Sequence, residues 1–173
     1  GVGNGDDAMG GGIYNAGSLS LDYCTLEDNR ALGGNGPDGG GNAYGGAIAS
    51  SGSLTINHST IKNNYATAGT GTNSTGTNNH AYGGGVYSTG ATTILNSTFY
   101  SNFAQGGSGN ANGGFAEGGA VSVVGSGSLG ITNSTFNANS AQAASGTNTG
   151  GNAYGGAVST TVATSVCLPL ASF

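Results

Sequence analysis

The sequence predicts an all-β fold, a parallel β-helix, from three observations. An internal repeat begins with a Gly-Gly pair and an Ile or Val near residues 10, 45, 83, 118 and 155, and spacings of 35–38 residues are typical of solenoids and arrays. Apolar residues keep the same columns in successive repeats. The 173 residues include 38 Gly, two basic and seven acidic residues, and the abundant Gly, Asn, Ser and Thr are mediocre or poor helix formers.

Each repeat contains three short segments. A Gly-Gly-x-Ile/Val segment comes first, a Leu-x-Ile alternation follows, and a Ser-Thr-Phe alternation comes third. A period of two places every second side chain on one face of a strand. The second and third alternations are out of phase, so a corner must separate them. The repeated columns are Leu21, Ile56, Ile94 and Ile131; Leu26, Ile61, Phe99 and Phe136; Asn29, Asn64, Asn102 and Asn139; and Ala31, Ala66, Ala104 and Ala141.

These coils must stack. A coil of about 22 residues cannot bury its apolar face alone, whereas stacked coils spaced about 4.8 Å apart share one interior. We therefore expect about four full coils and a partial fifth. The Asn column is expected to form a structural ladder at a corner, where each amide hydrogen-bonds the next one along the axis. The Gly pairs are expected where a corner needs a positive φ or where backbones approach closely.

Polar inserts lie between the coils. Residues 32–44, 67–82, 105–117 and 142–154 are rich in Gly, Asn, Thr and Ser and show no strand alternation, which predicts loops on one flank. Tyr44, Tyr82 and Tyr154 each precede a Gly-Gly pair, and Glu117 takes that place in the remaining insert. Stacked tyrosines are able to contact sugars or protein, which makes these three the candidate ligand contacts; the alternative is a ladder that closes the base of each loop.

The chain divides into a lead-in (residues 1–9), the repeat domain (residues 10–159) and a tail (residues 160–173) that departs from the pattern. The tail is interpreted as a cap on the last coil or as a truncated end. Cys24 takes the column position of Ser59, Ser97 and Ser134, which favours a small buried filler over a reactive thiol. Its separation from Cys167 by several coils predicts no disulfide.

Composition excludes several partners and cofactors. Two basic residues cannot neutralise a phosphate backbone, so no nucleic-acid partner is expected, and no apolar run approaches the ~20 residues of a membrane span. Asp6, Asp7 and Asp38 lie in Gly-rich segments that faintly suggest calcium turns, but the later inserts contain no Asp. His58 and His80 stand apart from any Cys or carboxylate cluster. We expect no metal, no cofactor and no catalytic residue in this chain.

The repeat resembles a known family. Gly45-Gly46-Ala47-Ile48 with Ile61-Lys62-Asn63-Asn64, and Gly118-Gly119-Ala120-Val121 with Phe136-Asn137-Ala138-Asn139, resemble the repeats of polymorphic outer membrane proteins, which are bacterial autotransporter passengers, and the wider group of right-handed β-helix surface proteins. The resemblance covers roughly residues 10–158. It implies a right-handed helix and a secreted, cell-surface or outer-membrane passenger, often adhesive.

These features favour a non-enzymatic structural or adhesive module, extracellular or on the cell surface. It would display its polar flank to a glycan or to a host or cell-surface protein, and its open coil ends favour end-to-end self-association. The first alternative is a fragment of a carbohydrate-active β-helix enzyme of the polysaccharide lyase or hydrolase type. Such chemistry needs paired carboxylates, whereas Glu27 and Asp28 are adjacent and point to opposite faces. The lesser alternative is ice binding through the outward threonine column Thr25, Thr60, Thr98 and Thr135.

Overall fold

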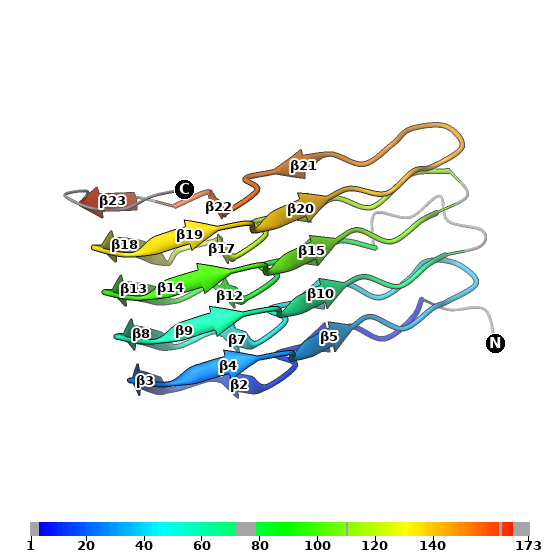
Figure 1. The fold of residues 1–173 in the computed structure, drawn as a ribbon. Coiled ribbons are helices and arrows are strands. Elements are labelled where there is room, and N and C mark those ends of the chain that lie inside the picture. Colours follow the sequence, from blue (N-terminus) through cyan, green and yellow to red (C-terminus); the bar gives the residue numbers. More distant parts are fainter. Residues whose placement is uncertain (1–3, 72–78, 110, 163, 168–173) are drawn as a thin grey trace.

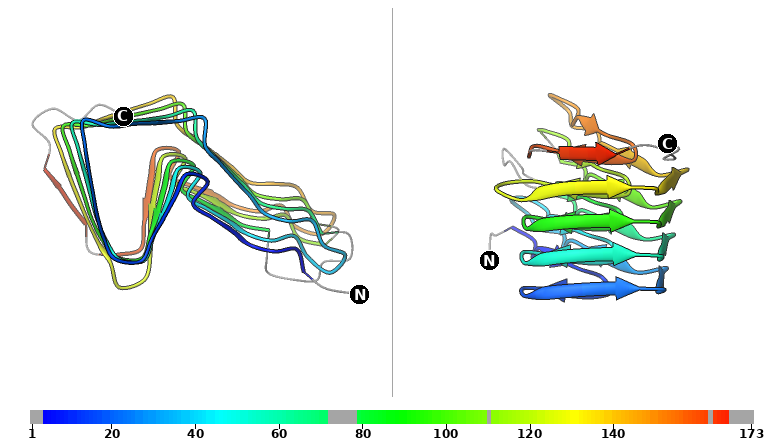
Figure 2. Two further views of the ribbon diagram at one scale, coloured as in Figure 1. Left: turned by 90° about the horizontal axis from the view of Figure 1, so that it is seen from below. Right: turned by 90° about the vertical axis from the view of Figure 1, so that its left-hand side faces the viewer.

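The computed structural model describes residues 4–71, 79–109, 111–162 and 164–167. These residues form β-strands and no helix, and the strands stack as a parallel, right-handed β-solenoid of about four turns (Figure 1). A view along the axis shows a three-sided body from which a flat arm projects (Figure 2). The sequence prediction of a parallel β-helix is therefore confirmed.

Three sheets form the body, and every pairing within them is parallel. The first sheet contains β2 (Ile13–Asn15), β7 (Ile48–Ser50), β12 (Val86–Ser88), β17 (Val121–Val123) and β22 (Val158–Thr160). The second sheet contains β3 (Ser18–Asp22), β8 (Ser53–Asn57), β13 (Ala91–Leu95), β18 (Ser128–Thr132) and β23 (Thr164–Cys167). The third sheet contains β4 (Thr25–Glu27), β9 (Thr60–Lys62), β14 (Thr98–Tyr100) and β19 (Thr135–Asn137).

Two more sheets form the arm. The outgoing arm sheet contains β5 (Arg30–Leu32), β10 (Tyr65–Thr67), β15 (Phe103–Gln105) and β20 (Ser140–Gln142). The returning arm sheet contains β1 (Ala8–Met9), β6 (Ala43–Tyr44), β11 (Ala81–Tyr82), β16 (Ala116–Glu117) and β21 (Ala153–Tyr154). The arm corresponds to the predicted inserts, and most of their described residues lie outside strands; short strands occur where the arm leaves and rejoins the body. Isolated parallel bridges also join Gly36, Gly71, Gly109 and Gly146 further out.

The body encloses an apolar core. The predicted columns are in register, with Ile56 beside Ile94 and Phe99 beside Phe136. These four side chains are at most 1% exposed. The two phenylalanine rings stack with centroids 4.9 Å apart. Each buried side chain of this size contributes roughly 1.5–3 kcal/mol, so the stacked columns are a major source of stability.

Asparagine side chains hold the corner between the third sheet and the outgoing arm sheet. The backbone N–H and the Nδ2 of Asn64 both donate to Oδ1 of Asn102, at 3.1 and 2.9 Å. The same pair of bonds joins Asn29 to Asn64 and Asn102 to Asn139. The Nδ2 groups of Asn64, Asn102 and Asn139 also each donate to a backbone carbonyl of the preceding turn. The ladder thus satisfies polar backbone groups that the corner would otherwise bury unpaired.

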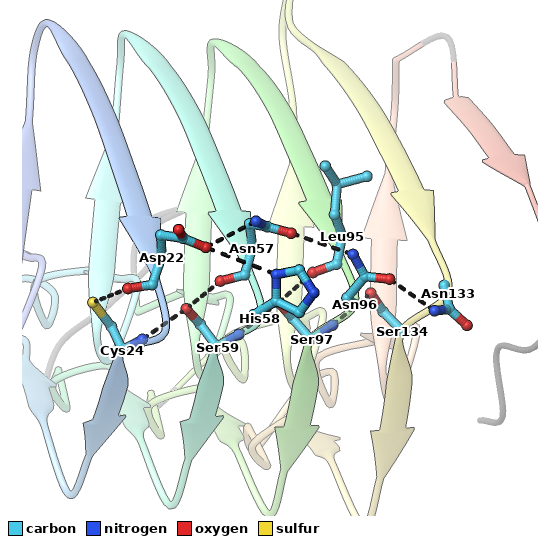
Figure 3. Close-up of polar contacts among 10 residues, drawn as sticks. All are labelled: Asp22, Cys24, Asn57, His58, Ser59, Leu95, Asn96, Ser97, Asn133 and Ser134. Carbon is cyan, nitrogen blue, oxygen red and sulfur yellow. Dashed lines mark hydrogen bonds and ion pairs between the residues drawn. The ribbon is translucent and has the colours of Figure 1, made fainter.

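A serine ladder performs the same task at the corner between the second and third sheets (Figure 3). Ser59 Oγ accepts from the N–H of Cys24 and donates to the carbonyl of Asn57, and Ser97 and Ser134 repeat this pattern. Cys24 is a free cysteine that packs against the edge of the core. The backbone of Cys167, in β23, belongs to the opposite end of the second sheet.

Each Gly-Gly pair makes the corner between the returning arm sheet and the first sheet. The first glycine of each pair has a φ between +59° and +65°. In the first four pairs the second glycine leaves no room for a side chain; a Cβ on Gly46, for example, would overlap the backbone of Gly84 and Tyr65. The pair therefore combines the two uses of glycine expected from the sequence.

The arm is thin because its two layers meet through small residues. Near the body, Ala31, Ala66 and Ala104 pack against Ala43 and Ala81 in a second small core. Further out, glycine backbones touch and hydrogen-bond between the layers: Gly34 donates to Asp6, Gly41 to Gly34 and Gly69 to Gly41, at 2.8–2.9 Å. Glycine is required here because any Cβ would enter the opposite backbone.

The chain ends adjoin this framework. In the predicted lead-in, β1 pairs with β6. In the predicted tail, β23 pairs with β18 and extends the second sheet. Residues 1–3, 163 and 168–173 lie outside the described part, as does the middle of the second insert (residues 72–78). A search of the described residues finds no helix with the length and hydrophobicity to cross a membrane.

The first prediction concerns the asparagine ladder. Replacing Asn102 with Ala removes the acceptor of two donors on Asn64, and both side chains are fully buried. We expect the free energy of unfolding in urea to fall by about 2–5 kcal/mol. Asn137→Ala, at an exposed position in β19, is the control and should change it little. Equal losses in both variants would contradict the structural role of the ladder.

The second prediction concerns the arm. A Cβ on Gly107 would overlap the carbonyl oxygen of Gly69, whereas a Cβ on Gly130 meets nothing within 4 Å. Gly107→Ala should therefore lower the thermal unfolding midpoint. Gly130→Ala, in β18, should raise stability by roughly 0.5–1 kcal/mol because alanine loses less entropy on folding. If Gly107→Ala leaves the midpoint unchanged, the close contact between the arm layers is wrong.

Candidate functional site

The returning arm sheet and the first sheet meet in an inward corner that runs along the axis (Figure 2), and we call this corner the groove. One wall is the outer face of the returning arm sheet, and the other is the outer face of the first sheet. Because the strands are in register, each turn adds one residue to each wall. The arm wall presents Met9, Tyr44, Tyr82, Glu117 and Tyr154. The body wall presents Tyr14, Ala49, Tyr87, Ser122 and Ser159.

Cavities lie at both ends of this groove. One, of about 150 Å³, is lined by Met9, Tyr14, Ala49, Ser50, Ser51, Tyr87 and Thr89. Another, of about 340 Å³, is lined by Phe115, Glu117, Tyr154, Ser159, Thr160 and Thr161. Both combine aromatic surface with hydroxyl groups, a mixture typical of small-molecule and sugar-contacting sites.

The tyrosines fill the middle of the groove. Tyr44 and Tyr82 are stacked with centroids 5.1 Å apart and planes 2° from parallel. Tyr87 reaches across from the body wall and lies tilted against both, at 4.8 and 5.8 Å. The stacked faces cover one another, so this part of the predicted tyrosine strip closes the base of the arm.

Tyr154 stands apart from the other two predicted contacts. Glu117 occupies the rung between Tyr82 and Tyr154, so the strip is interrupted. Tyr154 instead makes an edge contact with Phe115 at 6.4 Å, and 47% of its surface is exposed. It therefore offers an accessible ring beside the larger cavity.

Burial raises the pKa values of several side chains in the groove. It is the largest cause raising the pKa of Tyr82 to about 12, and the neighbouring Glu117 carboxylate adds to the effect. The pKa values of Tyr44 and Tyr87 are raised as well, chiefly by burial. Burial also raises the pKa of Glu117, which a hydrogen bond with Ser159 partly offsets. The phenols consequently remain neutral hydrogen-bonding groups at physiological pH.

Sequence reasoning did not single out Tyr14, Tyr87 or Ser122 as site residues. They follow the Ile or Val of the Gly-Gly segment, so strand alternation alone would have placed them outward. The sequence did not predict the arm, and it is the arm that makes this outward face one wall of a groove. Ser122 is completely buried there, and its Oγ has no hydrogen-bond partner.

The other polar candidates lie apart from the groove or serve structure. Lys62 Nζ lies 2.6 Å from a carboxylate oxygen of Glu27, on the surface of the third sheet. His58 lies 3.8 Å from Asp22 on an exposed corner (Figure 3). Its ring also stacks on Tyr23, with centroids 4.7 Å apart. Asp7 Oδ1 accepts from the N–H of Asn42 in the arm.

His80 accepts a bond from the N–H of Phe115 and stacks on its ring. Within the described part of the chain, no three His, Cys, Asp or Glu side chains gather into a potential metal site. In the threonine column considered for ice binding, Thr60 and Thr98 are in register on neighbouring strands, but both are half-buried.

Comparison with known proteins adds no relative to this description. The chain matches no family model, no curated protein and no solved structure. The geometry of the groove is therefore the basis for inferring function.

The third prediction concerns Glu117. A pKa raised above 4.5 means that the folded state favours the neutral carboxyl, so the stability from this group is present below pH 4.5 and lost as the pH rises through the folded pKa. Glu117→Gln should therefore raise the thermal midpoint at neutral pH, and this gain should disappear in acid. Glu27→Gln, which breaks an exposed ion pair, is the control and should give no gain. A loss of stability in Glu117→Gln at neutral pH would contradict the assignment.

Proposed function

We propose that this chain is a non-enzymatic binding module of a secreted or cell-surface protein, and that it binds neutral glycan chains at the two cavities between the arm and the body. The observation that carries the proposal is the pair of cavities at the two ends of one groove, each lined by aromatic rings and hydroxyl groups. Aromatic side chains offer flat apolar surface together with polar edges, and hydroxyl groups pair with hydroxyls of a ligand.

Charge supports a neutral ligand over an acidic one. The chain carries a net charge of −5, and neither of its two basic residues, Arg30 and Lys62, lines the described cavities. A polyanionic ligand would meet repulsion from Glu117 without a compensating cation. A chain of neutral sugars avoids that cost.

Rigidity supports passive binding. The strands of both walls are paired in parallel with their neighbours, on both sides in the middle turns and on one side in the terminal turns, which carry Tyr14 and Tyr154. A preformed groove loses little conformational entropy when a ligand binds, which favours affinity without a moving lid.

A carbohydrate-active enzyme is the second candidate, and Glu117 is the observation that favours it. A half-buried carboxyl with a raised pKa in a groove has the properties of a general acid. Among the described residues that line the two cavities, however, Glu117 is the single carboxylate, and glycoside hydrolysis ordinarily needs a pair. The groove therefore favours binding over cleavage.

The fourth prediction tests glycan binding by affinity electrophoresis of the intact chain in gels that contain a soluble polysaccharide. Neutral β-glucan, galactomannan and xylan are compared with acidic polygalacturonate. We expect retardation by at least one neutral polymer and none by the acidic one. Tyr154→Ala should weaken retardation about fivefold, since it removes an accessible ring from the groove.

Tyr100→Ala is the matched control, because Tyr100 is similarly exposed (45% against 47%) but lies on the third sheet, away from the groove. Its retardation should equal that of the wild type. Absence of retardation by every neutral polymer, or equal weakening in both variants, would overturn the proposal. Release of new reducing ends during incubation would instead establish the enzymatic alternative.

A further inference from the structure

The body wall of the groove contains a notch one turn wide. Tyr14, Ala49 and Tyr87 are direct neighbours on β2, β7 and β12, so the two tyrosines stand two turns apart with only a methyl group between them. At about 4.8 Å per turn, their rows are separated by about 9.6 Å. A ring placed midway would lie about 4.8 Å from each, within the 4.5–7 Å range of stacked ring contacts.

The notch has the size of one six-membered ring. Its cavity of about 150 Å³ is similar to one that holds a benzene molecule in another protein. Ala49 forms the floor and is itself 2% exposed, whereas Tyr14 is 58% exposed and accessible at the rim. Hydroxyl groups of Ser51 and Thr89 lie on the side of the corner to the second sheet.

We propose that this notch binds a single pyranose ring of a neutral saccharide between Tyr14 and Tyr87. The inference rests on the proposed function, because it assigns one sugar subsite within the groove. The occupant follows from the lining: two aromatic side chains suit the apolar faces of a sugar ring, and the rim hydroxyls suit its edge. No charged side chain lines this cavity among the described residues, so a charged ring has no partner there.

The contacts of Tyr87 make the notch a preformed site. Its ring rests against Tyr44 at 4.8 Å and Tyr82 at 5.8 Å, and this packing fixes one side of the notch before a ligand arrives. Ala49, at the floor, is 2% exposed and is paired with a strand neighbour on each side. Only the exposed Tyr14 needs to settle onto the ligand, which limits the entropy lost on binding.

The test fills the notch with the residue found on either side of it. Ala49→Tyr would complete a row of three tyrosines and occupy the space of the ligand. Binding of methyl β-glucopyranoside, methyl β-galactopyranoside and methyl α-mannopyranoside is measured by ligand-observed NMR on the intact chain. We expect at least one of them to bind wild type with millimolar affinity. Ala49→Tyr should weaken that binding at least tenfold; because Ala49 is 2% exposed, the larger side chain should also lower the thermal midpoint, and binding is measured below the midpoint of the variant.

Control variants keep the test interpretable. Ala91→Tyr adds the same side chain at an exposed position of β13, on the second sheet, and should bind like wild type. Tyr14→Ala removes an exposed ring and leaves the core unchanged, so the variant should fold normally. It should also lose most of the glycoside binding. If Ala49→Tyr fails to fold, Tyr14→Ala decides the outcome.

The possible results separate this inference from the proposed function. Suppose that polysaccharides retard the chain in a Tyr154-dependent manner, but that no glycoside binds wild type or the glycosides bind Ala49→Tyr and Tyr14→Ala as tightly as wild type. The subsite is then wrong and the glycan-binding function stands. Binding of p-cresol with no glycoside binding would show an aromatic side chain as the occupant and would also overturn the subsite. If neither polymers nor glycosides bind wild type, both proposals fall.

Discussion

Parallel pairing between successive turns is the interaction on which this structure depends. No single turn has an interior, so each apolar residue is buried only by equivalent residues above and below it. Pairing must therefore keep register, since a slip of one residue would turn Ile56 and Ile94 away from the core. The Asn and Ser ladders stabilise that register at two corners, because each amide or hydroxyl reaches a partner only when the turns are aligned.

The arm extends the same constraint with smaller residues. Alanine replaces the large apolar side chains next to the body, and glycine replaces alanine further out, so the two layers approach until their backbones hydrogen-bond. A thicker arm with large side chains would leave the body at a different angle. The inward corner, and hence the groove, is set where each Gly-Gly pair joins this thin arm to the first sheet, with the first glycine at a φ of +59° to +65°.

The sequence was sufficient to predict the body and insufficient to predict the arm. Columns such as Leu26, Ile61, Phe99 and Phe136 keep their spacing, so both the fold class and the inward direction of these residues followed from the repeat. In the inserts, the glycines that pack two layers together are the residues that also signal flexible loops. Composition alone does not separate these states; the contact between Gly41 and Gly69 across the layers does.

Only one wall of the candidate site could be predicted from the sequence. Tyr44, Tyr82 and Tyr154 were found through their place before each Gly-Gly pair, but the sequence alone did not show that Tyr44 and Tyr82 cover one another, while Tyr154, separated from them by Glu117 and on the end strand of the sheet, stays exposed. The facing wall, from Tyr14 to Ser159, had no signal beyond strand alternation, because an outward residue on a lone strand is ordinarily solvent-exposed. The arm makes that outward face one wall of a groove.

A solenoid that repeats its backbone every turn can vary its binding surface one residue at a time. The body wall shows this directly: tyrosine, alanine, tyrosine and two serines stand at the same backbone position in five turns. Each exchange changes the local depth of the groove without disturbing the pairing beneath it, because the side chain points away from the core. Such a surface suits an elongated ligand that makes several modest contacts in sequence. The same geometry limits charge in the groove: a second carboxylate would have to enter the same corner as Glu117, where burial already disfavours one negative charge.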